Sequence, residues 1–493
     1  MIRMTSRITF AAAIGLIALA GWADTPAPYP DLALDDVGWV QLSNSGHADA
    51  QQAFHHGLAQ LHNFEYGSAR TDFREAQRID PDFALAYWGE AMTHNHPIWL
   101  EQDRAAALEA LARYAPTPAA RQEKAPTPLE RDLLAAVDVL YGDGAKEERD
   151  DAYAAFMGQV AARHPEQVEV AAFHALSILG TAHEGRDYSV YMRAAAITQQ
   201  WIHRYPQHPG VAHYQIHATD DPIHAPLGLA AANAYARIAP NAAHAQHMTT
   251  HIFLALGDWD GTVSANARAS ELMNEGRAER GLPPVGCGHY PSWLMYGHLQ
   301  RGDTDAAGEI MLRCAANVAS EEAFRGRGYY AWQRALFLFD TLAWDGEVAN
   351  LAVSLEDDAN AFQEAITDGW VALGRGRIGA ARRALDRARA LDEGLEDPWE
   401  GNAVLVLQLE GRIALAAGDA DRAEALLRDA VALERALPFG FGPPRPAKPS
   451  LELLGETLLE LGRPEAAIEA LRAGLERTPN KRASVAALAR AGA

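Results

Sequence analysis

The segment LELLGETLLELGRPEAAIEALRAGLERTPN, residues Leu451–Asn480, contains two apolar-periodic stretches on either side of a turn at Gly462. Small residues stand where two helices must approach closely, and Leu471 stands where a neighbouring pair fills the gap. Pro479 ends the second stretch, because proline interrupts a helix. The segment therefore predicts two antiparallel helices, with close-approach positions at Gly455, Ala467 and Gly474.

The same pattern occurs in Ala53–Pro81 and in Leu407–Leu433. Alternating runs of β-branched residues are almost absent, so the chain is expected to be all-α. A period of about 34 residues is typical of the tetratricopeptide repeat (TPR), whose helix pairs stack into a superhelix with a concave surface. We therefore predict an all-α, TPR-like α-solenoid, a right-handed superhelix of helical hairpins.

Turn residues and changes in composition divide the chain into segments. The linker sequence PFGFGPPRPAKP predicts a plain connector, with a hinge or a plug folded over the groove as alternatives. Residues Ala115–Glu130 contain Ala-Pro-Thr-Pro twice and are expected to be loop. The predicted segments are a signal peptide (1–23), an N-terminal extension (24–46), a histidine-rich TPR-like region with a metal site (47–300), further TPR-like repeats (301–437), the Pro/Gly-rich linker (438–449), and a terminal repeat with a capping helix (450–493).

The first residues have the pattern of a secretory signal. Arg3 and Arg7 precede an apolar run from Ile8 to Ala20, and small residues follow near Ala23. This run is too short to cross a bilayer, and no later segment approaches about 18 apolar residues, so no membrane span is predicted. We expect a periplasmic or secreted protein. The net charge of −22 argues against nucleic acid as a partner.

The chain has two cysteines, Cys287 and Cys314, which are 27 residues apart. If they bracket one helical hairpin, the start of its first helix lies near the end of its second. An exported protein is able to close a disulfide there. The spacing leaves open whether the two are bonded.

Four histidines combine a metal-ligand spacing with the repeat period. His213 and His217 are four residues apart, as are His247 and His251, and the two pairs are offset by 34 residues. Four residues return a side chain to the same helical face about 6 Å further on. None of the 19 histidines lies in the last 195 residues. We therefore predict that two neighbouring first helices direct these four imidazoles at one ion on the concave face.

Four imidazoles suit a transition metal, and we predict copper or zinc. His244 lies one turn before His247 and is a further candidate ligand. Asp220 and Asp221 are expected either to orient the imidazoles or to cap the next helix. Weaker candidate ligands are His62, His96, His183 and His224. Packing or surface roles are expected for His55, His56, His164, His174, His203, His208, His289 and His298.

Other roles for these histidines stay open at this point. Without a metal, they would bind a peptide carboxylate or a ligand phosphate, form a structural polar network, or serve an enzyme as acid and base groups. The sequence has no His-Glu-x-x-His, Gly-x-Ser-x-Gly or Walker A motif, so it identifies no catalytic residue. The alternative function is a metal-free module that binds an extended peptide or a partner protein in its groove.

Aromatic residues follow the histidine-rich region. They are expected to pack in the core, with a stacking wall for a ligand as the alternative. These residues are Tyr290, Trp293, Tyr296, Tyr329, Tyr330 and Trp332.

Several longer stretches resemble a group of exported bacterial TPR proteins whose N-terminal half is rich in histidine. The stretches are His62–Trp99, His208–Pro240, His244–Asp260 and the terminal LLGETLLELGRPEAA. The resemblance implies the TPR fold and export. It implies no reaction and no catalytic residue.

Overall fold

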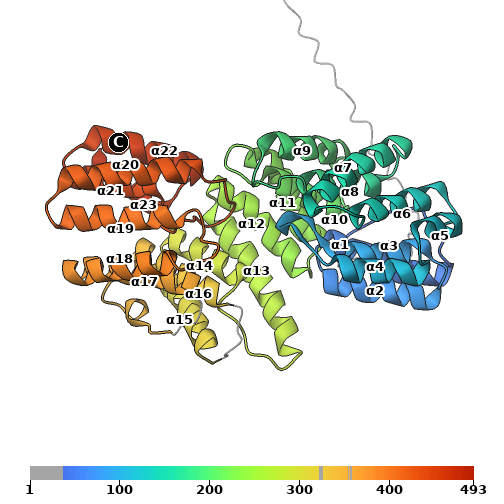
Figure 1. Cartoon of the computed structure of the whole chain (residues 1–493), viewed down its shortest axis with the longest axis horizontal. Coiled ribbons are helices and arrows are strands. Elements are labelled where there is room, and N and C mark those ends of the chain that lie inside the picture. The colour runs from blue at the N-terminus through green and yellow to red at the C-terminus, as the bar shows by residue number, and fades with distance from the viewer. Residues whose placement is uncertain (1–36, 321–325, 354, 356–357, 493) are drawn as a thin grey trace, which may run out of the picture. The chain divides into compact units, whose positions relative to one another are not determined.

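The computed structural model describes residues 37–320, 326–353, 355 and 358–492, and their regular secondary structure is almost entirely helical (Figure 1). The predicted signal peptide and residues 24–36 of the predicted extension lie outside the described residues. The first helices are α1 (Gln51–His62), α2 (Tyr66–Ile79), α3 (Ala84–Met92), α4 (Arg104–Tyr114), α5 (Pro118–Lys124), α6 (Pro128–Leu140), α7 (Lys146–Arg163), α8 (Val168–Leu179), α9 (Tyr188–Ile202), α10 (Pro209–Thr219) and α11 (Ala225–Ile238).

The helices that follow cover the C-terminal half. They are α12 (Ala243–Leu256), α13 (Trp259–Ala278), α14 (His289–Arg301), α15 (Thr304–Ser320), α16 (Arg327–Thr341), α17 (Asp358–Gly374), α18 (Ile378–Asp392), α19 (Asn402–Ala416), α20 (Ala420–Ala436), α21 (Ser450–Glu460), α22 (Pro464–Arg477) and α23 (Arg482–Ala491). Short 3-10 turns η1 (Ala48–Ala50), η2 (Pro97–Trp99) and η3 (Val348–Asn350) join them, together with a ribbon of β1 (Asn95–His96) and β2 (Glu101–Gln102).

Consecutive helices pack as antiparallel pairs, and first helices of neighbouring pairs also touch. Helix α10 contacts α8 and α12, and along the chain α14 contacts α16 and α17 contacts α19. This two-level packing is what a solenoid of stacked hairpins requires. The all-α, TPR-like fold is confirmed, and the three quoted repeat segments correspond to the pairs α1–α2, α19–α20 and α21–α22.

The turn between α12 and α13 shows how the sequence sets the hairpin. Gly257 adopts a positive φ of 69°, which ends α12 at little steric cost. Asp258 then accepts a hydrogen bond from the Gly261 amide at 3.0 Å and caps α13. The Gly-Asp pair thus stops one helix and starts the next.

The expectation that Ala115–Glu130 is loop was wrong. Thr117 and Thr127 are N-caps, and the proline after each is the first residue of α5 or α6. Proline suits this position because its missing amide hydrogen would have no partner in the first turn. The Thr-Pro sequences therefore mark helix starts.

The Pro/Gly-rich segment Pro438–Pro449, hereafter the strap, is packed against the helices. The Trp332 indole of α16 donates a hydrogen bond to the Pro444 carbonyl at 3.2 Å. A Cβ on Gly442 would lie 2.4 Å from the Trp293 ring of α14, so only glycine fits there. The Phe441 ring centroid lies 4.9 Å from that of His251. The strap therefore covers part of the surface formed by α12, α14 and α16.

A buried ionic network fixes the C-terminal repeat. The Lys481 ammonium lies 2.8 Å from Asp340 of α16 and 3.2 Å from Glu452 of α21. Glu452 also pairs with Lys448 at 2.8 Å. Beside this network, the Asn480 carbonyl accepts a hydrogen bond from the Trp259 indole at 3.0 Å. The end of the chain thus returns to the start of α13.

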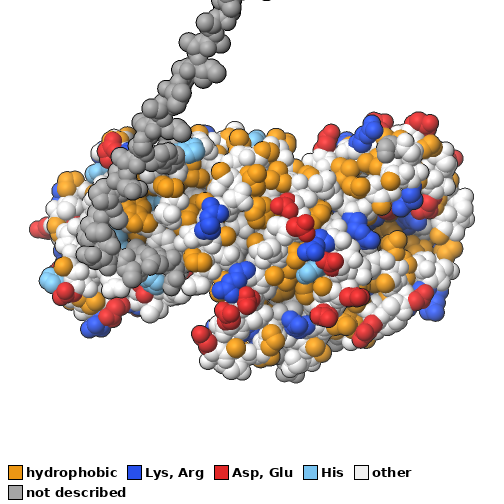
Figure 2. Space-filling view, turned by 180° about the vertical axis from the view of Figure 1, so that it is seen from behind, with side chains coloured by type: hydrophobic (Ala, Val, Ile, Leu, Met, Phe, Trp, Pro, Cys, Tyr) orange, Lys and Arg blue, Asp and Glu red, His pale blue; other side chains and the backbone are white. Residues whose placement is uncertain are grey.

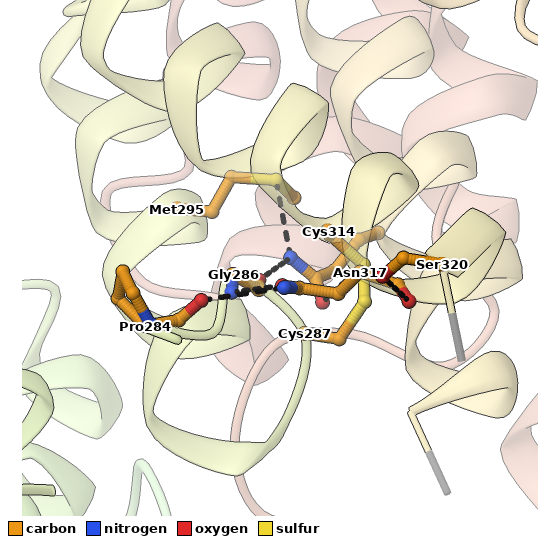
Figure 3. Close-up of a disulfide and its surroundings, with 8 residues drawn as sticks. Pro284, Gly286, Cys287, Met295, Cys314, Asn317 and Ser320 are labelled. Atoms are coloured by element: carbon orange, nitrogen blue, oxygen red, sulfur yellow. Dashed lines mark hydrogen bonds between the residues drawn. A yellow bond between two sulfur atoms is a disulfide. The ribbon is translucent and has the colours of Figure 1, made fainter. Parts of the chain in front are cut away.

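A disulfide joins Cys287, just before α14, to Cys314 in α15 (Figure 3). Their Cα atoms are 4.5 Å apart. Asn317 accepts a hydrogen bond from the Gly286 amide at 2.9 Å and donates one to the Pro284 carbonyl at 3.3 Å. The disulfide and the asparagine together hold the loop that precedes His289.

On the face shown in Figure 2, acidic and basic side chains are interspersed with apolar ones. Among the described residues, no helix combines the length and the apolar character needed to cross a membrane.

We predict that Glu452→Gln changes both the stability and its dependence on pH. Burial alone would raise the pKa of Glu452, but the ammonium groups of Lys448 and Lys481 lower it from 4.5 to about 2. A carboxylate with a lowered folded pKa stabilises the fold above pH 4.5, and this contribution is lost as the pH falls toward 2. Urea unfolding at pH 7 should show a loss of about 3 kcal/mol.

The control is Glu75→Gln, which removes an exposed pair with Arg78 and should leave the stability almost unchanged, because solvent screens the pair. The variant Glu452→Gln should also flatten the fall in stability between pH 4.5 and 2. An acid-unfolding curve identical to that of the wild type would contradict the assignment.

Reduction of the Cys287–Cys314 disulfide should lower the free energy of unfolding by about 3 kcal/mol, because the bond constrains a loop of 27 residues. Urea unfolding with and without a reductant measures this difference. The double variant Cys287→Ser/Cys314→Ser should show no response to the reductant. A wild type that is equally insensitive would mean that the bond is absent in solution.

Candidate metal centre

Two neighbouring first helices carry the central histidines. Helix α10 supplies His213 and His217, and α12 supplies His244, His247 and His251. All five side chains are buried, and α10 lies against α12 (Figure 1). The 34-residue offset thus places the two histidine pairs on helices that face each other.

The central histidines form two sets of three, each with ligand atoms within 4.8 Å of one another, and Asp220 forms a further such group with His217 and His251 that links the two sets. The first set is His213, His217 and His244, and the second is His247, His251 and His289. The four histidines that the sequence directs at one ion are therefore divided between two sets. His289 comes from a third helix, because it is the first residue of α14.

In each set, two Nε2 atoms face each other at short range. The distance is 3.3 Å between His213 and His244, and 3.1 Å between His247 and His251. Two imidazole nitrogens bound to one tetrahedral ion at about 2.0–2.1 Å lie about 3.3 Å apart. Both separations therefore match the edge of a metal tetrahedron.

Hydrogen bonds on the other ring nitrogen fix how these imidazoles are protonated. His213 donates from Nδ1 to the His62 carbonyl at 2.6 Å, and His247 donates to Asn266 Oδ1 at 2.8 Å. His251 donates to Asp220 Oδ2 at 2.8 Å. A neutral imidazole that donates from Nδ1 keeps a lone pair on Nε2. Metal-binding histidines in proteins are held in this way.

The pair His247–His251 has a specific electrostatic requirement. Both rings donate from Nδ1, so in their neutral forms two Nε2 lone pairs face each other across 3.1 Å. Lone pairs at this distance repel unless a cation lies between them. Either a proton or a metal ion satisfies the pair.

Burial keeps most of the cluster uncharged. It lowers the pKa of His213, His244 and His247 well below 6.5, and the neighbouring histidines lower it further. Burial, with His251 and Arg445 nearby, lowers the pKa of His289 to about 3. The His217 Nε2 atom is buried and has no hydrogen-bond partner among the described residues. Neutral imidazoles with free lone pairs are the form that binds a metal.

Asp220 and Asp221 follow α10, and each has one of the two expected roles: the first orients an imidazole and the second caps the next helix. Asp220 accepts the His251 hydrogen bond and also pairs with Arg186. Burial alone would raise the pKa of Asp220, but Arg186 and the histidine hydrogen bonds lower it, so the group stays a carboxylate. Asp221 instead accepts from the amides of Ile223 and His224 at 3.0 and 3.1 Å. It caps the chain before α11.

The weaker candidates lie outside the two sets. His96 stacks on Tyr66 at 4.0 Å between ring centroids. His183 bonds to Asp151 at 3.1 Å, and the His224 Nδ1 bonds to Asp221 at 2.9 Å. The structure brings none of them to the central cluster.

His62 instead joins a third buried group with Glu169 and His208. Glu169 accepts from the His62 Nε2 at 2.5 Å and from the His208 Nε2 at 3.0 Å. The His62 Nδ1 accepts from the Tyr214 hydroxyl at 2.8 Å. Every ring nitrogen of this group has a partner, so the group is a structural network that holds the carbonyl behind His213.

A cavity of about 760 Å³ lies beside the second histidine set. His289, Asp220 and Trp293 line it, together with residues of the strap and of the C-terminal repeat. The first histidine set does not reach this cavity.

The family comparison adds to the fold assignment. Residues 449–481, which cover α21 and α22, match the tetratricopeptide repeat. The chain carries a tetratricopeptide repeat. No curated protein matches the sequence.

Several solved structures align with the chain over most of its length. Yeast Tom70 is 10% identical over 90% of this chain and 88% of that chain, with a TM-score of 0.39. The APC/C hetero-tetramer Cut9-Hcn1 is 13% identical over 93% and 79%, with a TM-score of 0.35. The human IFIT1 dimer with m7Gppp-AAAA is 11% identical over 92% and 90%, with a TM-score of 0.34.

Sequence reasoning did not identify His289 as a candidate ligand or Glu169 as part of the buried network, whereas the packing role expected for His208 agrees with its place in that network. His289 lies 38 residues after His251 and follows a Gly/Pro loop, so it has no place in the 34-residue register. Glu169 meets His62 across 107 positions, a separation that no local pattern encodes.

The metal-free protein should lose stability as the pH falls below 6.5. A histidine whose folded pKa is lowered binds more protons when unfolded, so its stabilising effect is complete above pH 6.5 and declines below it. Each such histidine adds a slope of about 1.4 kcal/mol per pH unit. Urea unfolding in a chelator between pH 8 and 5 measures the slope.

The variant His247→Gln should reduce this slope, whereas His203→Gln, at an exposed position, should leave it unchanged. A wild-type stability that stays constant from pH 8 to pH 5 would show that these imidazoles bind protons equally in the folded and unfolded protein, and would contradict their lowered pKa.

Proposed function

We propose that this TPR protein binds a transition-metal ion, copper or zinc, in its buried histidine cluster. The supporting observation is the pair His247–His251, whose Nε2 atoms face each other at 3.1 Å while both Nδ1 atoms donate to protein acceptors. His289 completes a set of three nitrogen ligands. Uncharged nitrogen ligands favour zinc and copper over calcium or magnesium.

The hydrogen bonds that Asn266 and Asp220 accept from His247 and His251 also support this proposal. Each fixes one imidazole through Nδ1, which orients the ring and makes Nε2 the basic atom. Arg186 balances the charge of Asp220, so this carboxylate stays ionised. The arrangement is that of a preorganised ligand set.

Three protein ligands leave a coordination position for water or substrate, and a bound metal there supplies Lewis-acid or redox chemistry. His289 borders the 760 Å³ cavity, so an exchangeable position in the second set would face that cavity. Which molecule reaches the ion through this cavity determines whether the site catalyses a reaction, carries the ion or stabilises the fold.

The proposal includes export. The secretory pattern at the N-terminus supports it, and so does the disulfide, since disulfides persist in oxidising compartments. In such a compartment, histidine ligands have an advantage over thiols, which oxidise.

Metal analysis of protein purified from its native compartment tests the proposal. We expect at least one equivalent of copper or zinc per chain, and less than about one tenth of that in His247→Gln/His251→Gln. The matched control, His203→Gln at an exposed position, should retain the full amount. Circular dichroism establishes that the double variant folds. A folded wild type without stoichiometric metal, and with no uptake on titration, would refute the proposal.

A second candidate function is a metal-free module that binds an extended peptide or partner protein in its groove. The matched tetratricopeptide repeat favours it. Exhaustive chelation separates the two candidates, since only the first predicts that the melting temperature falls with the chelator and recovers with metal.

A further inference from the structure

The cavity beside the histidine cluster has an aromatic wall. Trp293, Tyr329 and Trp332 line it from α14 and α16, and Phe439 and Phe441 line it from the strap. Trp293 also stacks on His251, with 4.6 Å between ring centroids. A volume of about 760 Å³ lies in the range of small-molecule sites, about 300–1,000 Å³. The walls are therefore suited to a flat apolar body.

The strap narrows the choice of occupant. Through Gly442 and Pro444 it lies on the rings of Trp293 and Trp332 and so covers part of the helical surface. The cavity beside it has the volume of a small-molecule site. This arrangement favours a compact ligand over a long peptide.

Two arginines line the cavity, and among the described residues no carboxylate forms an ion pair with either. The Arg445 guanidinium lies 4.4 Å from the centre of the Trp332 ring, and its side chain is exposed and therefore accessible to a ligand. Arg477 donates a hydrogen bond to the Glu434 carbonyl at 3.4 Å. In a chain with a net charge of −22, two arginines without a carboxylate partner in one cavity wall favour an anionic ligand.

The start of α14 adds to the positive potential. His289 is the first residue of this 13-residue helix, and Gly288 provides no side-chain cap. The N-terminus of a helix attracts an anion. Four acidic residues line the cavity, and each is either engaged or solvated. Asp220 pairs with Arg186, Glu434 accepts from the Ser450 amide at 2.7 Å, and Asp397 and Glu400 are exposed.

We propose that the cavity binds a small aromatic carboxylate, with its carboxylate at Arg445 and its ring among Trp293, Tyr329 and Trp332. The ligand would then lie between Arg445 and His289, next to the proposed metal position. The proposal deepens the proposed metal-dependent function, since it names the class of molecule that reaches the metal. The cavity itself is formed by protein side chains alone, so its binding can be measured without metal.

Isothermal titration with indole-3-acetate tests the proposal, with indole-3-acetamide as the neutral counterpart. The chelated wild-type protein should bind the acid about tenfold more tightly than the amide, because only the acid forms a charge-assisted pair with arginine. The variant Arg445→Gln should lose this preference and bind both probes equally. The control Arg428→Gln, on the exposed face of α20, should bind as the wild type does.

Equal binding of acid and amide by the wild type, or no binding of either, would overturn the proposal without reference to the metal. Unchanged preference in Arg445→Gln would also overturn it. A hexapeptide with an amidated C-terminus that binds where indole-3-acetate does not would assign the cavity to peptides instead. Loss of metal with retained acid binding would refute the metal proposal alone, so the two failures are distinguishable.

Discussion

The close packing of α10 against α12 is the constraint on which the site depends. Because His213 and His217 repeat at four residues and recur 34 residues later, two ligand pairs meet across one interface. The imidazoles are then fixed by acceptors from elsewhere in the chain: the His62 carbonyl, Asn266 and Asp220. In these buried rings, one nitrogen donates a hydrogen bond and the other faces a second imidazole. The facing lone pairs of His247 and His251 repel each other unless a cation lies between them.

The surrounding structure supports this geometry over long sequence distances. Glu169 lies between His62 and His208 and so holds the backbone carbonyl that receives the His213 hydrogen bond. The Cys287–Cys314 disulfide holds the loop before His289. The strap lies beside His251 and closes part of the cavity. Residues from distant repeats therefore position the imidazole nitrogen atoms of the candidate site.

Sequence reasoning succeeded where a feature is local or repeats at the TPR period. The hairpins of Ala53–Pro81, Leu407–Leu433 and Leu451–Asn480 follow from small and large residues at fixed spacing, and the structure confirms them. The Gly257-Asp258 turn is local and follows the same logic. The error at Ala115–Glu130 arose because Thr-Pro was taken for a loop when it marks a helix start.

What the sequence could not predict is how ligands are shared among helices. His289 belongs to a helix whose phase is set by a Gly/Pro loop and a disulfide, so periodicity gave no reason to place it beside His247. Metal binding itself stays a prediction, and an anomalous diffraction map at the copper and zinc edges tests it most directly. The account predicts a peak within about 2.1 Å of the Nε2 atoms of His247 and His251. A well-ordered crystal grown with metal that shows only a hydrogen bond between these rings, and no peak, would contradict it.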